Sequence, residues 1–474
     1  MLIKKEAPTE NLKTKRKNNI KLIVKQVFKK MLSNFKNKFI ASLLIATMIP
    51  IVAISEDIKS FSILEKENLT TEETFLNIIQ EIILVQPEFR QAIAIKNEYT
   101  ENRKYASRLR YPTLTAQIIN DRTISRQISF VNGLRKSQDD AFDAQITIDQ
   151  PLYQGNEINS KVKLAKLEIS KSSIELNRIA SELILTATEI YLNTASAELI
   201  ANYCEDLFKD LEKFRGIVKK RFDAGIISNS EMAIVNVRLS EIAAQIALLQ
   251  ADKIKTSSIY RSFFKKEYKG LGLPIITLKS MLSNQTKVTK FSYDELLAKN
   301  TIKNKQTDLE LTKSQYRPKF GFSARYTRYD IDNNERDDND IRGGFYFNFP
   351  LFNFGRGSAE VSASKARIEQ AKVNADKSKR DREYNFASIF GSSSGSLQAR
   401  NKILDSYKNV RLQRETFLKS ISSSDFSVPA LLEAASREIN IFQQLIENEK
   451  KLLISDFENS HLNTTLLNRF QISL

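Results

Sequence analysis

The sequence predicts a mostly helical protein with an internal duplication, in which each half also contains one pair of β-strands. Three observations lead to this fold class. The chain of 474 residues has only 13 glycines, 9 prolines and no tryptophan, a composition that suits long helices. Short alternating segments occur in both halves, and each is followed by an unusually long helical pattern. Matching motifs lie about 199 residues apart, which indicates two copies of one plan.

The first 55 residues have the pattern of a basic leader followed by a signal peptide. Residues 1–38 contain twelve Lys or Arg and two Glu, and the apolar run Phe39–Ala53 follows them. This run is too short and too interrupted by proline to span a membrane comfortably, which takes about 20 residues. A start at Met31 gives an ordinary signal peptide with cleavage after Ser55, so we expect a secreted protein. An N-terminal membrane anchor is the alternative.

Charge and reactive side chains argue against two classes of function. The net charge is +17, but the basic leader holds most of it, and no zinc-ligand spacing or aromatic-interleaved basic stripe accompanies the rest. We therefore expect no nucleic-acid binding. Cys204 and His461 are the only cysteine and histidine, which makes a disulfide, a histidine-cluster metal site or a Cys–His nucleophile improbable. The sequence predicts no enzymatic activity, no metal and no cofactor.

The duplication divides the mature chain into two structural repeats. We expect an N-terminal segment, a first repeat, a linker, a second repeat and a C-terminal tail, at 56–71, 72–272, 273–290, 291–468 and 469–474. Each repeat is expected to contain a helix, a β-hairpin and a long helical hairpin. The β-hairpins are expected at about 113–150 and 319–350, and the helical hairpins at about 156–268 and 356–468.

The motif at the end of each β-hairpin is the clearest sign of the duplication. Pro-Leu-Tyr-Gln-Gly, from Pro151 to Gly155, recurs as Pro-Leu-Phe-Asn-Phe-Gly, from Pro350 to Gly355. Proline and glycine at the end of an alternating segment predict a turn out of a strand. These four residues are therefore the expected strand-exit turns.

The expected strands have one apolar side and one polar side. Phe142, Ala144, Ile146 and Ile148 alternate with polar or charged residues, which is strand periodicity. Strands of about ten residues with this pattern suit a barrel wall between lipid and water. A soluble sheet is the alternative, because the signal in each segment is weak.

The long helical patterns must pack side by side with other helices. About 65 residues of helix span roughly 100 Å, far more than a globular domain needs. The first long helix has two apolar stripes, which imply two neighbouring helices, as in the wall of a tube. At the first hairpin tip Gly225 supplies a permissive backbone and Ser228 a helix cap, and Ser427 is placed to cap the helix after the second tip.

The order of these features over about 72–468 resembles the TolC family of outer-membrane efflux proteins. The resemblance rests on the signal peptide, the two strand-exit motifs and the Gly-Ile-Ile-Ser tip at Gly225. It implies a homotrimer in the cell outer membrane, in which each protomer adds four strands to one twelve-stranded β-barrel. It also implies that the helices form a coiled-coil tunnel in the periplasm, which docks an adaptor protein and an inner-membrane transporter. Four strands alone cannot close a barrel, so oligomerisation is expected independently.

The resemblance also assigns a constriction to the helical tips. The family's ring of acidic residues falls on Ala430, which has no charge, and on Glu433, and the acidic residue after the first tip falls on Glu231. A basic family residue falls on Phe426, with Asp425 beside it, so the resemblance does not extend to the usual salt-bridge gate. Three Glu433 side chains could form a cation-favouring ring. A solvated carboxylate near a helix N-terminus is the alternative.

Adaptor docking is implied at the same tips. The contact candidates are Gly225, Ser228, Ser424 and Ser427, and Ser424 replaces the glycine of the first repeat. The sequence does not choose between drug efflux and type I protein secretion, because substrate choice lies mostly in the pump. The rival interpretation is a periplasmic structural or tethering coiled-coil protein.

Overall fold

The computed structural model describes residues 59–62, 64, 69–122, 140–278, 291–332, 338–420 and 427–472. All of them belong to one compact unit, Ile58–Leu474. The expected leader and signal peptide lie outside the described residues, as do parts of the expected linker and strand loops. The docking candidate Ser424 and the tip residues Asp425 and Phe426 also lie outside them.

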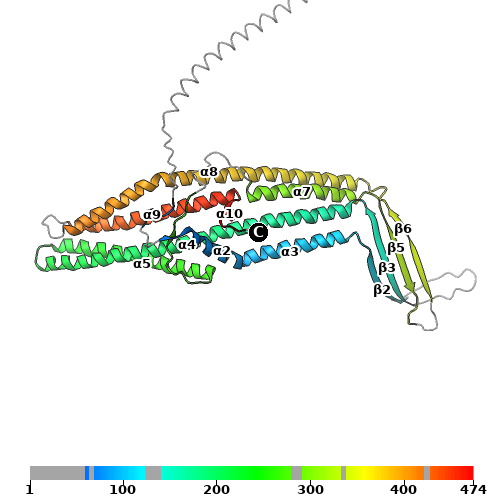
Figure 1. Ribbon diagram of the computed structural model, residues 1–474, viewed down its shortest axis with the longest axis horizontal. Coiled ribbons are helices and arrows are strands. Elements are labelled where there is room, and N and C mark those ends of the chain that lie inside the picture. Colours follow the sequence, from blue (N-terminus) through cyan, green and yellow to red (C-terminus); the bar gives the residue numbers. More distant parts are fainter. Residues whose placement is uncertain are drawn as a thin grey trace, which may run out of the picture. The chain divides into compact units, whose positions relative to one another are not determined.

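The described chain contains two copies of one series of elements (Figure 1). The first copy consists of β1 (Leu69–Thr70), α2 (Glu72–Val85), α3 (Pro87–Arg108), β2 (Thr113–Arg122), β3 (Asp140–Gln154), α4 (Glu157–Asp223) and α5 (Asn229–Phe264). The second consists of β4 (Leu273–Pro274), α7 (Tyr293–Ser314), β5 (Lys319–Arg328), β6 (Asn339–Asn348), α8 (Arg356–Lys419), α9 (Val428–Leu462) and α10 (Leu466–Arg469). Both α8 and α9 begin 199 residues after their counterparts α4 and α5, so the predicted mostly helical, duplicated fold is confirmed.

One local difference concerns the single helix expected at the start of the first repeat, before the β-hairpin at about 113–150. The structure has two helices there, because Pro87 opens α3 and the residue before it, Gln86, is extended with φ −63° and ψ 138°. Proline has no N–H and disfavours helical geometry at the preceding residue, so it interrupts one helix and starts the next.

The four longer strands form one antiparallel sheet in the order β2-β3-β5-β6. The strands β2 and β6 are its edges, and each is ten residues long. β3 has 15 residues, because it continues past Pro151 to Gln154 with a register shift between Pro151 and Tyr153. A proline inside a central strand is accommodated where a bulge interrupts the ladder.

Two long helices run along the helical part of this unit, and shorter helices pack beside them (Figure 1). α4 has 67 residues, about 100 Å of helix, and it packs against α3, α5, α7 and α9. α8 has 64 residues and packs mainly against α7 and α9. The strands lie at one end of these helices, and the first helical tip, the end of α8 and the start of α9 lie at the other (Figure 1).

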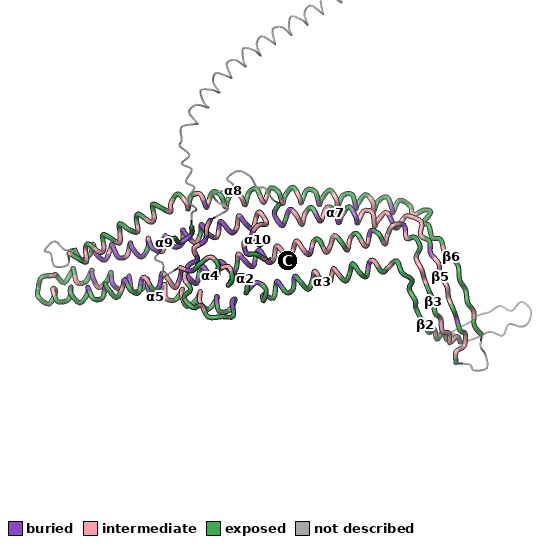
Figure 2. The backbone as a smooth tube through the Cα atoms, viewed as in Figure 1, coloured by how far each residue is buried: buried purple, intermediate pink, exposed green. Residues whose placement is uncertain are grey.

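The densest core lies near the middle of the helices, where α2, α4, α9 and α10 meet (Figure 2). Phe75 packs edge-on against Tyr191 at 5.1 Å between ring centroids, and it also contacts Phe457 and Phe470. All four side chains are fully buried. Burial of side chains of this size, about 1.5–3 kcal/mol each, holds the two repeats together at this level.

Candidate functional site

The first strand exit is held in place by backbone packing. Gly155 has φ +63°, and a side chain there would meet the carbonyl oxygen of Ser314 at 2.5 Å. Asn156, also left-handed with φ 75°, precedes α4, and the ammonium of Lys319 pairs with Glu157 at 2.5 Å. Of the two residues predicted for this turn, Gly155 therefore makes the exit, whereas Pro151 lies inside β3.

The second strand exit is looser. β6 ends at Asn348, and Pro350 lies in an unpaired stretch that reaches Gly355, which has φ +81° and precedes α8. A side chain at Gly355 would meet only the hydroxyl of Ser358, at 3.8 Å. The large side chains in this stretch are highly exposed, and Phe354 reaches 91%. The two exits share sequence motifs but differ in how firmly they are packed.

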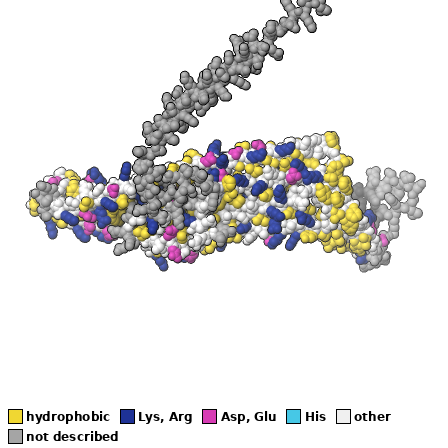
Figure 3. All heavy atoms as spheres, turned by 45° about the horizontal axis from the view of Figure 1, so that its top comes forward, with side chains coloured by type: hydrophobic (Ala, Val, Ile, Leu, Met, Phe, Trp, Pro, Cys, Tyr) yellow, Lys and Arg dark blue, Asp and Glu magenta, His cyan; other side chains and the backbone are white. Residues whose placement is uncertain are grey.

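One face of the sheet is an exposed apolar surface. Directly opposite residues in a sheet point to the same face, and the register aligns apolar side chains across all four strands. The exposed members are Leu114, Ile118, Ile146, Ile148, Phe320, Tyr326, Ile341, Phe345 and Phe347. Figure 3 shows hydrophobic side chains gathered at the strand end, while charged side chains are scattered over the helices. A continuous apolar surface of this kind indicates contact with lipid or another protein.

The first helical tip is a well-capped turn. Gly225 has φ +75°, its N–H donates to the Phe222 carbonyl, and the next N–H reaches back to Arg221, both at 2.9 Å. Ser228 and Glu231 then form a capping box at the start of α5. Hydrogen bonds from the backbone N–H and the hydroxyl of Ser228 lower the pKa of Glu231. The Glu231 carboxylate is therefore engaged with the cap.

The second tip has weaker capping than the first. Ser427 precedes α9, but its side chain makes no capping bond, and Pro429 lies in the first turn. Ala430 and Glu433 are one turn apart, and the Glu433 carboxylate accepts a bond from Arg437 Nε at 3.2 Å. Glu241, and more weakly Glu433, raise the pKa of Arg238 on α5. The structure thus places basic neighbours beside the one carboxylate that was expected to form an acidic ring.

A buried network of charged and tyrosine side chains joins the two helical hairpins, farther along the helices than the tips. Glu438 on α9 is fully buried and accepts a bond from Arg414 Nε on α8 at 2.5 Å. The hydroxyl of Tyr203 on α4 donates to the same carboxylate and accepts a bond from Tyr407 at 3.1 Å. Burial, together with the Glu438 charge, raises the pKa of Tyr203, so the phenol stays protonated. One carboxylate therefore holds three helices together.

Two more buried carboxylates on α9 are held in the same way. Glu449 pairs with Arg400 at 2.5 Å and accepts the Phe61 N–H at 2.8 Å. Asp456 pairs with Arg469 on α10. The sequence analysis did not single out these acids within the expected helical hairpin at about 356–468. A charged residue at a seam position of a helix was the signal that could have found them.

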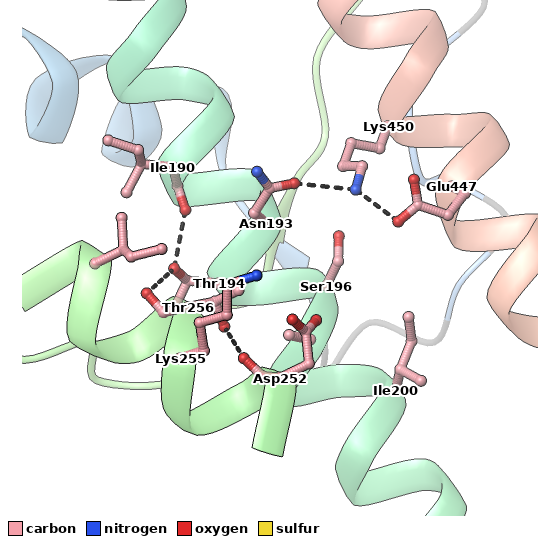
Figure 4. Close-up of a pocket in the computed structure, with 12 residues that line it drawn as sticks. Ile190, Asn193, Thr194, Ser196, Ile200, Asp252, Lys255, Thr256, Glu447 and Lys450 are labelled. Carbon is pink, nitrogen blue, oxygen red and sulfur yellow. Dashed lines mark hydrogen bonds and ion pairs between the residues drawn. The ribbon is translucent and has the colours of Figure 1, made fainter. Parts of the chain in front are cut away.

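The hairpins also meet around a cavity of about 250 Å³ between α4, α5 and α9 (Figure 4). Lys450 on α9 spans the contact, donating to Asn193 on α4 at 3.0 Å and to Glu447 at 2.6 Å. The hydroxyl of Ser196 points into this space and has no hydrogen-bond partner among the described residues. Separating the helices at a polar contact beside a cavity requires less free energy than separating an apolar contact of the same area.

Two further properties of the described residues bear on function. No group of three His, Cys, Asp or Glu side chains among them could hold a metal ion. Among the described helices, α5 has the length and apolar composition that would allow it to cross a membrane. Several of its apolar side chains are exposed, including Val237 at 57% and Leu248 at 74%.

Comparisons with known proteins identify relatives by structure only. No protein-family model matches the sequence, and no curated protein matches it. Among solved structures, CusC superposes with a TM-score of 0.69 at 12% identity, over 86% of this chain and 96% of CusC. The outer-membrane protein VceC from Vibrio cholerae gives 0.67 at 14% identity, over 84% of this chain and 96% of VceC. The CmeC outer-membrane channel of Campylobacter jejuni gives 0.64 at 12% identity, over 82% and 86%.

These structures are outer-membrane efflux channels of the TolC family. The family resemblance noted in the sequence is therefore confirmed at the level of fold. At identities of 12–14% the likeness concerns the arrangement of helices and strands.

Proposed function

We propose that this chain is one protomer of a trimeric outer-membrane export channel, a passive conduit for small molecules or unfolded proteins. In this proposal the sheet lies in the cell outer membrane, the helices form a tunnel in the periplasm, and residues 1–55 direct secretion. The main support is the sheet, which combines an exposed apolar face with two edge strands that have no further partner in the described chain. The fold shared with outer-membrane channels agrees with this interpretation.

The edge strands support a trimer. β2 and β6 have equal lengths of ten residues, so the β6 of one protomer can pair along its whole length with the β2 of the next. Three copies of four strands would give a closed barrel of twelve strands, which leaves no open edge in the membrane. The apolar face would then contact lipid and the polar face would line water.

Exposed apolar side chains on α5 and α8 support the same assembly. α5 exposes Val237 and Leu248, and α8 exposes Tyr384 at 74% and Leu412 at 61%. A water-filled tunnel would not favour these side chains, whereas a neighbouring helix would cover them. We therefore interpret the apolar composition of α5 as a subunit contact of the tunnel wall.

The helical tips are the proposed docking end. An adaptor protein, and through it an inner-membrane transporter, would contact Gly225, Ser228, Ser424 and Ser427. Glu433, Ala430 and Glu231 would lie at the periplasmic constriction. In this proposal the protein acts without catalysis or cofactor, and the choice between drug efflux and type I secretion is made by the pump. Deletion of the gene, followed by measurement of both dye accumulation and the secreted proteome, distinguishes the two.

The direct test is to fractionate cells and to run the purified protein on an unheated gel. We expect a heat-sensitive trimer in the outer-membrane fraction and ion conductance in planar lipid bilayers. A soluble periplasmic monomer without conductance would contradict the proposal and would support the tethering alternative.

A substitution in α8 tests the assembly itself. Leu412→Glu is expected to convert the trimer band to monomer, because it places a charge in an apolar subunit contact, while the helical circular dichroism is retained. Gln413→Glu adds the same charge at a neighbouring exposed polar position and should leave the trimer intact. A stable Leu412→Glu trimer would remove this face of α8 from the subunit contact.

A further inference from the structure

We propose that Arg325 and Arg342 form a binding site for oxyanionic groups, such as carboxylates and phosphates, on the polar face of the sheet. The inference rests on the proposed function, because it takes this face to line the channel. It names the chemical class of solute that the barrel favours as it passes out of the cell.

The strand register brings the two arginines together. Arg325 on β5 is the direct partner of Arg342 on β6, and Thr147 on β3 is the partner of Arg325 on its other side. Thr115 on β2 completes this row, opposite Thr147. The Cβ atoms of directly opposite residues are about 4.5–5.5 Å apart, so both guanidinium groups can reach one small ligand.

The opposite face confirms which way the row points. The next row along the strands consists of Ala116, Ile146, Tyr326 and Ile341, which are aligned in the same manner. Successive residues of a strand alternate between faces, so these apolar side chains lie on the face away from the arginines. Ile341 is 78% exposed there. The arginine row therefore belongs to the polar face, which the proposed barrel turns toward water.

The partners of the two arginines leave one guanidinium available. Arg342 bonds the Asp340 carboxylate, two residues along the same strand, through Nε at 2.7 Å and Nη2 at 2.6 Å. Arg325 is different, because its Nε is buried and has no hydrogen-bond partner within the described part of the chain. A carboxylate or phosphate that accepts from the other nitrogens of the Arg325 guanidinium would compensate its charge, since guanidinium groups match such ligands with two parallel bonds.

The energetics of the pair also point to a ligand. Like charges directly opposite on neighbouring strands destabilise a sheet, so this pairing has a cost that packing does not explain. A bound oxyanion would offset the repulsion. On the same face, Asp340 and Asp149 lie in the nearest rows on either side of the arginine row, each two residues away along the strands. Arg342 is thus partly compensated, and the excess positive charge centres on Arg325.

Three protomers would repeat this row around the barrel. Six arginines at one height would then give a positive belt, bounded by carboxylates on both sides. Rings of basic side chains favour anions in pores, and the effect is screened as salt increases. The belt would raise the local concentration of anionic solutes at this height.

The test compares channels in planar bilayers under a KCl gradient, with inorganic phosphate as the probe ligand. For the double variant Arg325→Gln/Arg342→Gln we expect the chloride-to-potassium permeability ratio to fall by about twofold or more at 10 mM salt, with little change at 1 M. Phosphate should reduce the current through the wild type and have a weaker effect on the variant. Arg328→Gln is the matched control, because it removes an arginine from the apolar face of the same strand.

Each outcome decides between the inference and the proposed function. A wild type that inserts but conducts no ions would overturn both. A conducting channel whose selectivity and phosphate sensitivity are the same in the wild type and in the arginine variants would overturn only the proposed Arg325–Arg342 binding site. If the double variant does not assemble, the single Gln variants replace it, and each is expected to show a smaller shift of the same sign. The Arg325→Lys variant should keep the anion preference but lose phosphate sensitivity, because lysine retains the charge without the fork.

Discussion

The two helical hairpins have the same plan but different interiors. The buried residues of α4 and α5 are apolar or uncharged, with Tyr191, Leu192 and Val235 among those without any exposure. The interior of the second hairpin contains fully buried acids on α9, of which Glu438 and Glu449 are paired with arginines of α8. Apolar packing is not directional, whereas a buried ion pair is stable only in one geometry. The ion pairs of the second hairpin therefore restrict the register between α8 and α9, in addition to the apolar side chains that α9 also buries.

Their outer helices differ as well. α4 lies between other helices along its length, whereas the buried residues of α8 are limited to Gly357, Ser364, Ala371, Ser393 and Ser396. In the proposed trimer, a neighbouring protomer would cover part of this 64-residue helix. The comparison therefore shows that α4 is largely covered within the protomer, whereas α8, like part of α5, leaves much of its surface exposed.

Breaking an ion pair of the second hairpin should have the largest effect on stability. Arg414→Leu leaves the Glu438 carboxylate buried without its cation, which is expected to lower the free energy of unfolding by about 3–5 kcal/mol. Chemical denaturation followed by circular dichroism measures the loss. The double variant Arg414→Leu/Glu438→Leu should recover most of it, because an apolar pair replaces the ionic pair. A double variant as unstable as the single one would contradict this account of the second hairpin.

The apolar interior of the first hairpin is tested by Leu192→Ala. This change removes a fully buried side chain from α4 and is expected to cost about 2–5 kcal/mol in the same unfolding measurement. Leu248→Ala on α5 is the matched control, because that side chain is 74% exposed in the protomer. We expect it to weaken the trimer on unheated gels more than it weakens the protomer. Equal losses of unfolding free energy in both variants would contradict the assigned difference in burial.

A smaller effect is expected from His461, which joins the two repeats. Its Nδ1 lies 2.7 Å from the hydroxyl of Ser181 on α4, and its ring lies 5.5 Å from Tyr293 on α7. Burial lowers the pKa of His461 below its usual 6.5, with Asp294 opposing and Arg178 reinforcing the shift. The unfolded chain therefore takes up this proton first as pH falls. The stabilising contribution is complete above pH 6.5 and is lost as the pH falls through the folded pKa.

The control for this pH dependence is His461→Gln. His461 is the only histidine, so the variant should lack the slope that begins below pH 6.5. Burial and the neighbouring Glu189 raise the pKa of Glu458. This shift changes stability with pH in the opposite direction to that of His461, because a raised carboxyl pKa favours the folded state in acid. Only the difference between wild type and variant isolates the histidine. An unchanged slope would exclude His461 as its source.

The smallest effects are expected at the tips. If Glu433 lies at the constriction, Glu433→Gln should reduce the cation preference of the channel in planar bilayers. Arg437→Gln should increase it, because it removes the cation that bonds the Glu433 carboxylate. Opposite shifts in the two variants would support the acidic ring. Unchanged ion selectivity in both would remove Glu433 from it.

Most of the fold could be predicted from the periodicity of the sequence. The matching Pro-Leu motifs predicted the duplication, and the alternation from Phe142 to Ile148 predicted a strand of the sheet, because both depend on local pattern. Pro87 divided an expected helix, and its effect on Gln86 was available from the sequence alone. The extension of β3 past Pro151 was not, because a bulge depends on the partner strand.

The site was less predictable because its contacts join distant segments. Glu438 meets Tyr203 across 235 positions of the chain, and no local pattern relates them. The bond from Arg437 to Glu433 has helical i, i+4 spacing and could have been anticipated from the sequence. The roles of Glu433, Ala430 and the tip residues remain predictions, since they depend on neighbouring protomers and partners.

If the proposed function is correct, the unequal surfaces of the protomer bear on how the channel is assembled. The helices present much polar surface and can fold in water before three copies meet. The unassembled sheet is not expected to remain soluble in water, because its apolar face and both of its edges would promote aggregation. We therefore expect a newly secreted chain to fold its helices first and to close its barrel only at a bilayer. The 45 residues of β2, β3, β5 and β6 would then need protection from aggregation until they reach a bilayer, whereas the helices would not.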